Sequence, residues 1–291
     1  MWLLIATLCL VDLLWMAATG IALATSSILR IGAGVGCLGL IAYVYARRMP
    51  RIADLADVGA KTILFSAAAG ILSYLAITLN APLADAKFVA IDRALGFDWP
   101  AWFAWVQAHP VVHYTLLFAY NAVGPETILA LILLPLSGKG EVVREFMWAT
   151  MLSLLIIVPI SGALPAVSAW VYFDTGLRSD WIGPVLALRA HAMPVLDLGA
   201  MTGLIACPSF HTALGIILMA VTRFNRRLLI GSIVLNGIMI VSVPSEGSHY
   251  VIDVLAGASV AAIALFMARR VALFQWSYGS FVGGMMGARR T

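Results

Sequence analysis

Two short stretches of this chain carry residue types and spacings that suit chemistry. They are Pro208-Ser209-Phe210-His211 and His249-Tyr250-Val251-Ile252-Asp253, and each lies where an apolar run begins. On a helix, His249 and Asp253 would share one face because they are four residues apart. A carboxylate beside an imidazole fixes its tautomer and makes the other ring nitrogen a better nucleophile or base. His211, on a second helix, could then serve as a general acid.

Phosphorus chemistry uses residues of these types. A neutral His249 would attack a phosphate ester in line to give a phosphohistidine, while Asp253 would orient the ring and stabilise the cation that forms. A protonated His211 would donate to the leaving alkoxide and later accept a proton from the incoming water or alcohol. Ser209 and the first amides of its helix are candidates for holding phosphate oxygens, and Arg189 for clamping them. This chemistry needs no metal and no other cofactor.

Each of these residues also has a structural interpretation. Ser209 after Pro208 has the place of an ordinary helix N-cap. His249 with Asp253 is also the spacing of a structural pair on one helix, and Arg189 could anchor the chain to lipid headgroups. The functional interpretation is favoured because the chain has only five histidines and two of them begin apolar runs.

The composition indicates which elements must position these residues. Of 291 residues, 62% are hydrophobic and 11% are charged, which exceeds what the core of a soluble domain requires, so we expect the chain to lie in a bilayer. Spanning segments must then be helices, because the apolar runs are too long for barrel strands. A net charge of +4 reports mainly topology here, so it does not indicate binding to nucleic acid.

We therefore predict an all-α, polytopic integral membrane helix bundle with about eight transmembrane helices. The sixth is short and is expected to extend back toward Gly203. The predicted spans cover residues 2–24, 28–47, 61–80, 112–136, 145–164, 209–222, 228–244 and 249–268. Asp12 and Glu126 lie inside spans, where an ionisable group is either functional or paired with a neighbouring helix.

Two segments between the spans differ from simple turns. Residues 82–109 alternate charged and apolar side chains and then gather Trp residues, a pattern typical of helices that lie in the membrane interface. Residues 166–205, which include Arg189, form a long stretch with no convincing span. A long irregular segment in a compact protein is usually functional or disordered, and its aromatic content argues against disorder.

The distribution of Lys and Arg predicts the orientation. If the loop after the second span is cytoplasmic, 13 of the 18 Lys and Arg residues, with Arg289 and Arg290 among them, lie on the cytoplasmic side, and five, including Arg178, lie on the other. This bias satisfies the positive-inside rule with both termini inside. The same alternation places the turns that carry His211 and His249 on the non-cytoplasmic face. We expect a protein of the bacterial inner membrane with a periplasm-facing active site.

These motifs resemble signatures of the type 2 phosphatidic acid phosphatase superfamily. Pro208-Ser209-Phe210-His211 is similar to its second signature, and Ser242 with His249 and Asp253 has the spacing of its third, S-R-x5-H-x3-D. The signature arginine falls at Val243. The first signature, K-x6-R-P, is absent, because Ala190 follows Arg189 and Ile182 stands where the lysine would be. This pattern is similar to the branch that contains inositol phosphorylceramide synthases, with motifs PS-x-H-[ST] and H-Y-x-x-D.

The resemblance implies a six-helix core and a domain organisation. N-terminal membrane helices would occupy residues 1–59, a phosphatase-like catalytic membrane domain residues 60–270, including the interfacial segment 82–109, and a cytoplasmic tail residues 271–291. It also implies metal-free phosphohistidine chemistry on a lipid phosphate among membrane lipids, either hydrolysis or head-group transfer. The implied catalytic residues are His249, His211 and Asp253, and the implied substrate-binding residues are Ser209, Arg189 and Ser242.

Two other classes of function stay open. In a transporter or channel, Asp12 and Glu126 would line the pathway, although the sequence has no clear internal repeat and no pair of broken helices. An inactive, phosphatase-like binding protein would fit the loss of the signature arginine, although both histidines and Asp253 are present.

Overall fold

A computed structural model of the chain describes residues 1–177 and 179–287, with side chains described as far as residue 271. Arg178, Arg289, Arg290 and the end of the predicted tail lie outside the described residues. The fold is the expected all-α membrane bundle, and seven helices are long and apolar enough to span a bilayer. They are α1 (Trp2–Thr19), α2 (Thr25–Tyr45), α3 (Pro50–Ile77), α6 (Pro110–Leu136), α7 (Gly140–Ala163), α11 (Arg226–Glu246) and α12 (Val251–Gly287), whose spanning part is Val251–Val271.

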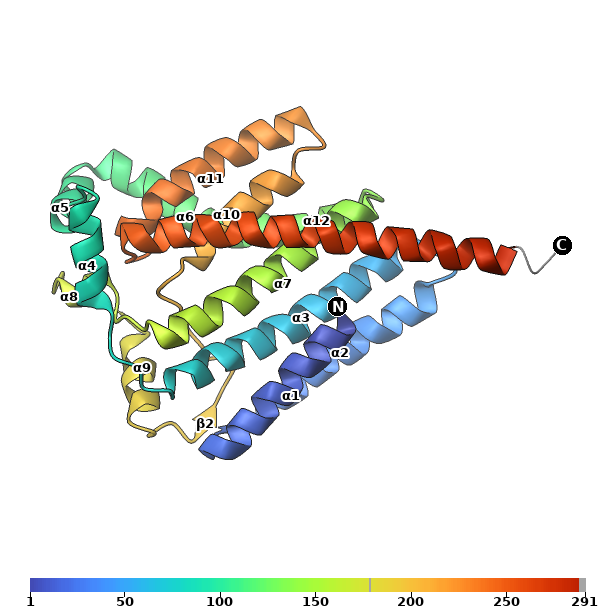
Figure 1. Ribbon diagram of the computed structural model, residues 1–291, viewed down its shortest axis with the longest axis horizontal. Helices are drawn as coiled ribbons and strands as arrows, with labels where there is room; N and C mark the ends of the chain where they lie inside the picture. The colour runs from blue at the N-terminus through green and yellow to red at the C-terminus, as the bar shows by residue number, and fades with distance from the viewer. Residues whose placement is uncertain (178, 288–291) are drawn as a thin grey trace.

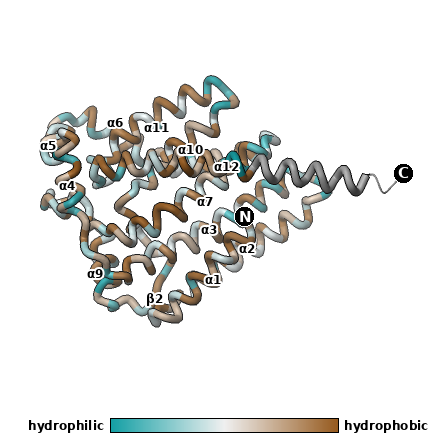
Figure 2. Tube along the Cα trace, in the orientation of Figure 1, coloured by the Kyte–Doolittle hydropathy of each residue, from teal (hydrophilic) through white to brown (hydrophobic). Residues whose placement is uncertain are grey.

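The bundle has two sides that meet at its central helices (Figure 1). On one side α1 and α2 pack against α3, and on the other α6 packs against α11. Helix α7 lies between them, in contact with both α3 and α12. Figure 2 shows hydrophobic residues along the helices and hydrophilic residues at their ends and turns, as expected for helices whose middle portions face lipid or one another.

The sixth predicted span, residues 209–222, forms a shorter helix than expected. Helix α10 (Phe210–Val221) has 12 residues, about 18 Å at 1.5 Å per residue, against about 30 Å for the hydrocarbon core. The expectation that it extends back toward Gly203 is wrong, because the backbone from residue 203 to Ser209 is irregular and Pro208 cannot continue a helix. Helix α10 packs among α6, α7, α11 and α12, and irregular backbone at this depth is tolerated where protein surrounds it.

The elements outside the spans gather at the end of the bundle where α12 begins (Figure 1). The predicted interfacial segment contains α4 (Asp85–Ala94) and α5 (Trp99–Ala108). The segment predicted to be irregular contains α8 (Ala169–Tyr172), α9 (Ile182–Arg189) and strand β2 (Val195–Leu196), which pairs in parallel with β1 (Ala22–Leu23). This pairing ties the connection between α1 and α2 to the segment that leads into α10.

The start of α3 differs from the prediction. The third span was expected at residue 61, but the helix begins at Pro50, because proline is favoured in the first turn of a helix. The predicted boundary at residue 59 therefore falls inside one continuous helix.

The intramembrane carboxylates have different surroundings. Glu126 of α6 accepts hydrogen bonds from Ser232 Oγ (2.9 Å) and Asn236 Nδ2 (2.8 Å) of α11, which is helix pairing of the kind that polar groups provide in lipid. Asp12 is 2% exposed, and neither carboxylate oxygen has a hydrogen-bond partner within the described part of the chain. Glu145, near the beginning of α7, forms ion pairs with Arg223 and Arg269.

Candidate active site

His249 and Asp253 form the predicted pair, although His249 lies in the turn before α12, which begins at Val251, and not on the helix as expected. Nδ1 of His249 lies 3.2 Å from Oδ2 of Asp253, and the same oxygen accepts a hydrogen bond from the amide of Tyr250 at 3.0 Å. Asp253 is fully buried and His249 is 8% exposed. Because one ring nitrogen faces the carboxylate, the other, Nε2, is left for a reacting group.

His211 and His249 line one cavity of about 230 Å³. The ring of Tyr120, from α6, stacks on the His211 imidazole with centroids 4.5 Å apart and planes 16° from parallel, and Tyr120 lines the same cavity. The remaining lining residues come from the segment before α10, from the turns around Ser168 and His249, and from the N-cap of α9: Ala166, Ser168, Trp181, Gly203, Leu204, Ile205, Ala206, Gly247 and Ser248. The imidazole of His211, on α10, and that of His249, in the turn before α12, therefore share one space.

Close packing of α10 on α12 brings the two histidines together. A Cβ atom added to Gly257 of α12 would lie 2.4 Å from the carbonyl oxygen of Ser209, which is shorter than any normal contact. The amide of Ser209 donates to the carbonyl of Asp253 at 2.9 Å. Only glycine at this position lets the start of α10 approach α12 so closely.

Asp92 of α4 binds the start of α12. Its carboxylate accepts hydrogen bonds from the amides of Val251 (2.8 Å) and Ile252 (2.9 Å). These are donors that the helix itself cannot satisfy, and the positive end of the helix dipole favours an anion there. Burial outweighs these two hydrogen bonds and raises the pKa of Asp92 above its ordinary value, and the nearby charge of Asp253 raises it further.

Asp85 and Trp99 hold the two residues that directly precede this contact, Tyr250 and His249. The Tyr250 hydroxyl donates to Asp85 Oδ1 at 2.8 Å, and burial with the nearby carboxylate raises the pKa of Tyr250, so its hydroxyl stays protonated. Trp99 Nε1 donates to the His249 carbonyl at 3.0 Å, and its ring stacks between Phe103 and Phe173. Helices α4 and α5 thus fix the backbone that carries His249.

Sequence reasoning did not find the role of Asp85 and Asp92. A signal was present, because the two carboxylates are seven residues apart and so lie on one face of a helix. Their partners at the start of α12, however, lie about 160 positions further along the chain, and local spacing does not reveal such a pairing. Cys207 was also missed as a neighbour of the pair: burial and the charge of Asp253 raise the pKa of its thiol, which keeps it neutral.

The three predicted substrate-binding residues are not among the residues described as lining the cavity. Ser209 is the N-cap of α10, where its Oγ accepts from the amide of Thr212 at 3.3 Å. Ser242 is buried in α11, and its hydroxyl donates to the Met239 carbonyl at 2.6 Å. Arg189, at the end of α9, donates from Nη1 to the Ala81 carbonyl at 2.8 Å. The structure therefore brings together the predicted catalytic residues but not the predicted clamp.

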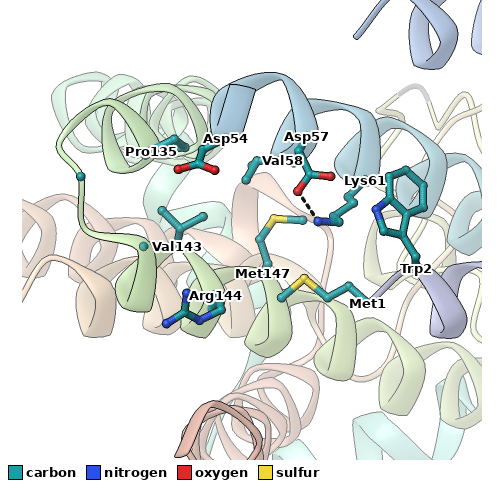
Figure 3. A pocket seen from close by; sticks show the side chains of 12 residues that line it. Met1, Trp2, Asp54, Asp57, Val58, Lys61, Pro135, Val143, Arg144 and Met147 are labelled. Carbon is teal, nitrogen blue, oxygen red and sulfur yellow. Dashed lines mark hydrogen bonds and ion pairs between the residues drawn. The ribbon is translucent and has the colours of Figure 1, made fainter. Parts of the chain in front are cut away.

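A larger cavity of about 400 Å³ lies elsewhere, where the beginning of α3 meets the end of α6. Figure 3 shows the residues that line it, which include Asp54 and Arg144. Asp57 and Lys61, also in the lining, form an ion pair. None of the described residues that line it is a histidine or a serine. The smaller cavity is therefore the candidate active site, because it is the one that contains a candidate nucleophile and a candidate acid.

Comparison with known families identifies the family of the chain. A model of the PAP2 superfamily matches residues 86–267, from α4 through the spanning part of α12. Because that range covers more than half of the chain, the protein belongs to the PAP2 superfamily, and the resemblance noted in the sequence is confirmed at that level. No curated protein and no solved structure matches the chain.

Replacing Asp92 tests whether α4 holds the start of α12. We expect Asp92→Ala to lower the free energy of unfolding by about 2 kcal/mol, because two partly buried amides lose their acceptor. The free energy of unfolding of Asp92→Asn should lie between those of Asp92→Ala and the wild type, since the amide oxygen of asparagine can still accept a hydrogen bond. The measurement is the thermal unfolding midpoint of protein purified in detergent.

Asp54→Ala is the matched control, because Asp54 is an exposed carboxylate in the other cavity. It should unfold like the wild type. If Asp92→Ala unfolds at the same temperature as Asp54→Ala, the contact with α12 contributes no stability and its positioning role is wrong.

Proposed function

We propose that this protein is a membrane enzyme that transfers the phosphoryl group of a lipid phosphate through a phosphohistidine at His249. One observation carries the proposal: His249, oriented by Asp253 at 3.2 Å, shares a cavity with His211. Membership of the PAP2 superfamily supports the same class, since its members are phosphatases or phosphotransferases.

In the first step, Nε2 of His249 attacks phosphorus and the bond from phosphorus to the leaving oxygen breaks. His211, protonated, gives its proton to that oxygen, so a neutral alcohol departs. The His249 ring becomes a phosphorylated cation while its Nδ1–H stays hydrogen-bonded to Asp253. In the second step, neutral His211 takes a proton from water or an alcohol, whose oxygen attacks phosphorus and breaks the P–N bond.

Burial strengthens the contribution of Asp253. The carboxylate has 0% exposure, so water screens its charge weakly and it stabilises the cationic intermediate more than an exposed group would. Oδ2 already accepts from the Tyr250 amide, which fixes the carboxylate before reaction. Stacking on Tyr120 similarly limits rotation of the His211 ring. Both catalytic groups are therefore held in place in the free protein.

The acceptor decides whether the reaction is hydrolysis or transfer. Water as acceptor gives a phosphatase, and the hydroxyl of a second lipid or head group gives a phosphotransferase. Similarity of the motifs to those of inositol phosphorylceramide synthases supports the transfer reaction. Position in the membrane supports a lipid substrate, because the seven apolar helices keep the cavity within reach of the bilayer.

The distribution of basic residues supports a non-cytoplasmic active site. Helix α12 begins at the His249 end, and the pair Arg269 and Arg270 lies at the far end of its spanning part, Val251–Val271. Glu145, Arg223 and Arg269 also cluster at that far end. Positive residues favour the cytoplasmic side, so the cavity would open toward the periplasm of a bacterial inner membrane.

Removal of each histidine tests the mechanism. In a phosphate-release and phosphate-transfer assay on purified protein, with lipid phosphates offered with and without alcohol acceptors, we expect His249→Ala to lower kcat by at least about 10⁴-fold, since the nucleophile is lost. His211→Ala should lower kcat by about 10²- to 10⁴-fold, the usual contribution of a general acid.

His109→Ala is the control, because His109 is exposed and bonded to the Trp105 carbonyl, outside the cavity. It should keep wild-type activity. Full activity of His249→Ala would refute the mechanism. Loss of activity in EDTA, restored by a divalent cation, would contradict a metal-free reaction.

Labelling of single cysteines tests the orientation. In a variant with Cys9, Cys37 and Cys207 replaced by alanine, we expect Ala192→Cys, an exposed position between α9 and β2, to react with a membrane-impermeant maleimide in whole cells. Ser137→Cys, exposed at the turn from α6 to α7, should react only after permeabilisation. The reverse pattern would place the cavity on the cytoplasmic side.

A further inference from the structure

Ser168 lies in the wall of the histidine cavity with an unused hydroxyl. The residue is 8% exposed and lines the cavity together with His211 and His249. Its Oγ is buried and has no hydrogen-bond partner within residues 1–177 and 179–287. Leaving a hydroxyl buried without a partner is unfavourable, so this group is expected to have a partner that the protein itself does not supply.

Three other buried serines have satisfied hydroxyls. Ser153, Ser242 and Ser245 each donate to a carbonyl of their own helix. Thr150 and Thr202 also carry unpartnered hydroxyls, but among the described residues with such a hydroxyl only Ser168 lines the cavity that the two histidines share. The unpartnered hydroxyl of Ser168 therefore lies in the candidate active site.

The backbone at Ser168 is held in an unusual conformation. Its φ of 94° lies in the region that favours glycine, and such strain persists only when surrounding contacts impose it. Asp85 accepts from the amides of Val167 and Ser168, and Ser248 accepts from the amides of Ala169 and Trp170 through its carbonyl and its Oγ. Contacts to the residues that precede His249 thus set the position of Ser168.

We propose that the Ser168 hydroxyl binds a non-bridging oxygen of the phosphoryl group that His249 attacks. This assignment rests on the proposed function. A phosphate oxygen is a strong acceptor, and a hydroxyl donor bound to a charged acceptor is more favourable than one bound to a neutral group. None of the described lining residues is Lys or Arg, and the signature positions hold Ile182 and Val243, so a neutral donor here takes over part of the task that signature cations perform.

Ser168→Ala tests the assignment, because the hydroxyl makes no bond in the free protein. We expect the variant to unfold at the wild-type temperature or slightly above it, since no hydrogen bond is lost. Its affinity for inorganic phosphate, measured by calorimetry, should fall by about 10- to 100-fold. Its kcat/KM for a lipid phosphate should fall by a similar factor.

Ser153→Ala is the matched control. Ser153 is also buried, but its hydroxyl donates to the Thr150 carbonyl at 2.8 Å. This variant should lose a little stability and keep wild-type affinity for phosphate. Ser168→Ala should therefore lose phosphate affinity without losing stability, whereas Ser153→Ala should lose stability without losing phosphate affinity.

The outcomes separate this inference from the proposed function. Wild-type phosphate affinity in Ser168→Ala, with His249→Ala inactive, would overturn the role of Ser168 and leave the mechanism intact. Weaker phosphate binding in Ser168→Ala, with no turnover of any lipid phosphate by the wild type, would support the subsite and contradict the enzyme. A wild-type protein that binds no phosphate would overturn the inference. So would a Ser168→Ala variant whose loss of phosphate affinity is fully explained by a loss of folded protein.

Discussion

Three successive amides at the beginning of α12 donate to carboxylates, and the site depends on this arrangement. The amide of Tyr250 donates to Asp253, and those of Val251 and Ile252 donate to Asp92. A helix start carries unsatisfied donors and the positive end of a dipole, so two anions stabilise it here. Because His249 directly precedes these amides, the same contacts set the position of the imidazole.

The interfacial helices act through this helix start. Asp92 binds its backbone, Asp85 binds the Tyr250 hydroxyl, and Trp99 binds the His249 carbonyl. Asp85 also holds the strained turn at Ser168, on another wall of the same cavity. One short helix therefore positions residues on two sides of the cavity, and mispositioning α4 would disturb both.

Patterns of residues close together in the sequence predicted the features that depend on neighbouring residues. Four-residue spacing paired His249 with Asp253, hydrophobic runs identified the spanning helices, and the mixed charges of residues 82–109 predicted short helices outside the spans. Contacts over long sequence distances were not predictable. Asp92 reaches α12 across about 160 residues, and Arg189 binds Ala81 because α9 packs on α3, which no local pattern encodes. The length of α10 was overestimated because composition does not show where irregular backbone lines a cavity.

Direct detection of the phosphoryl group on His249 is the measurement closest to the central claim. Purified protein would be mixed with a lipid phosphate labelled in its phosphate, quenched in alkaline denaturant and digested for mass spectrometry. A nitrogen-bound phosphate is stable in alkali and lost in acid. We predict label on the peptide that contains His249, absent from His249→Ala and chased by water or alcohol. Turnover without label on this peptide, or label on a hydroxyl residue instead, would contradict the account.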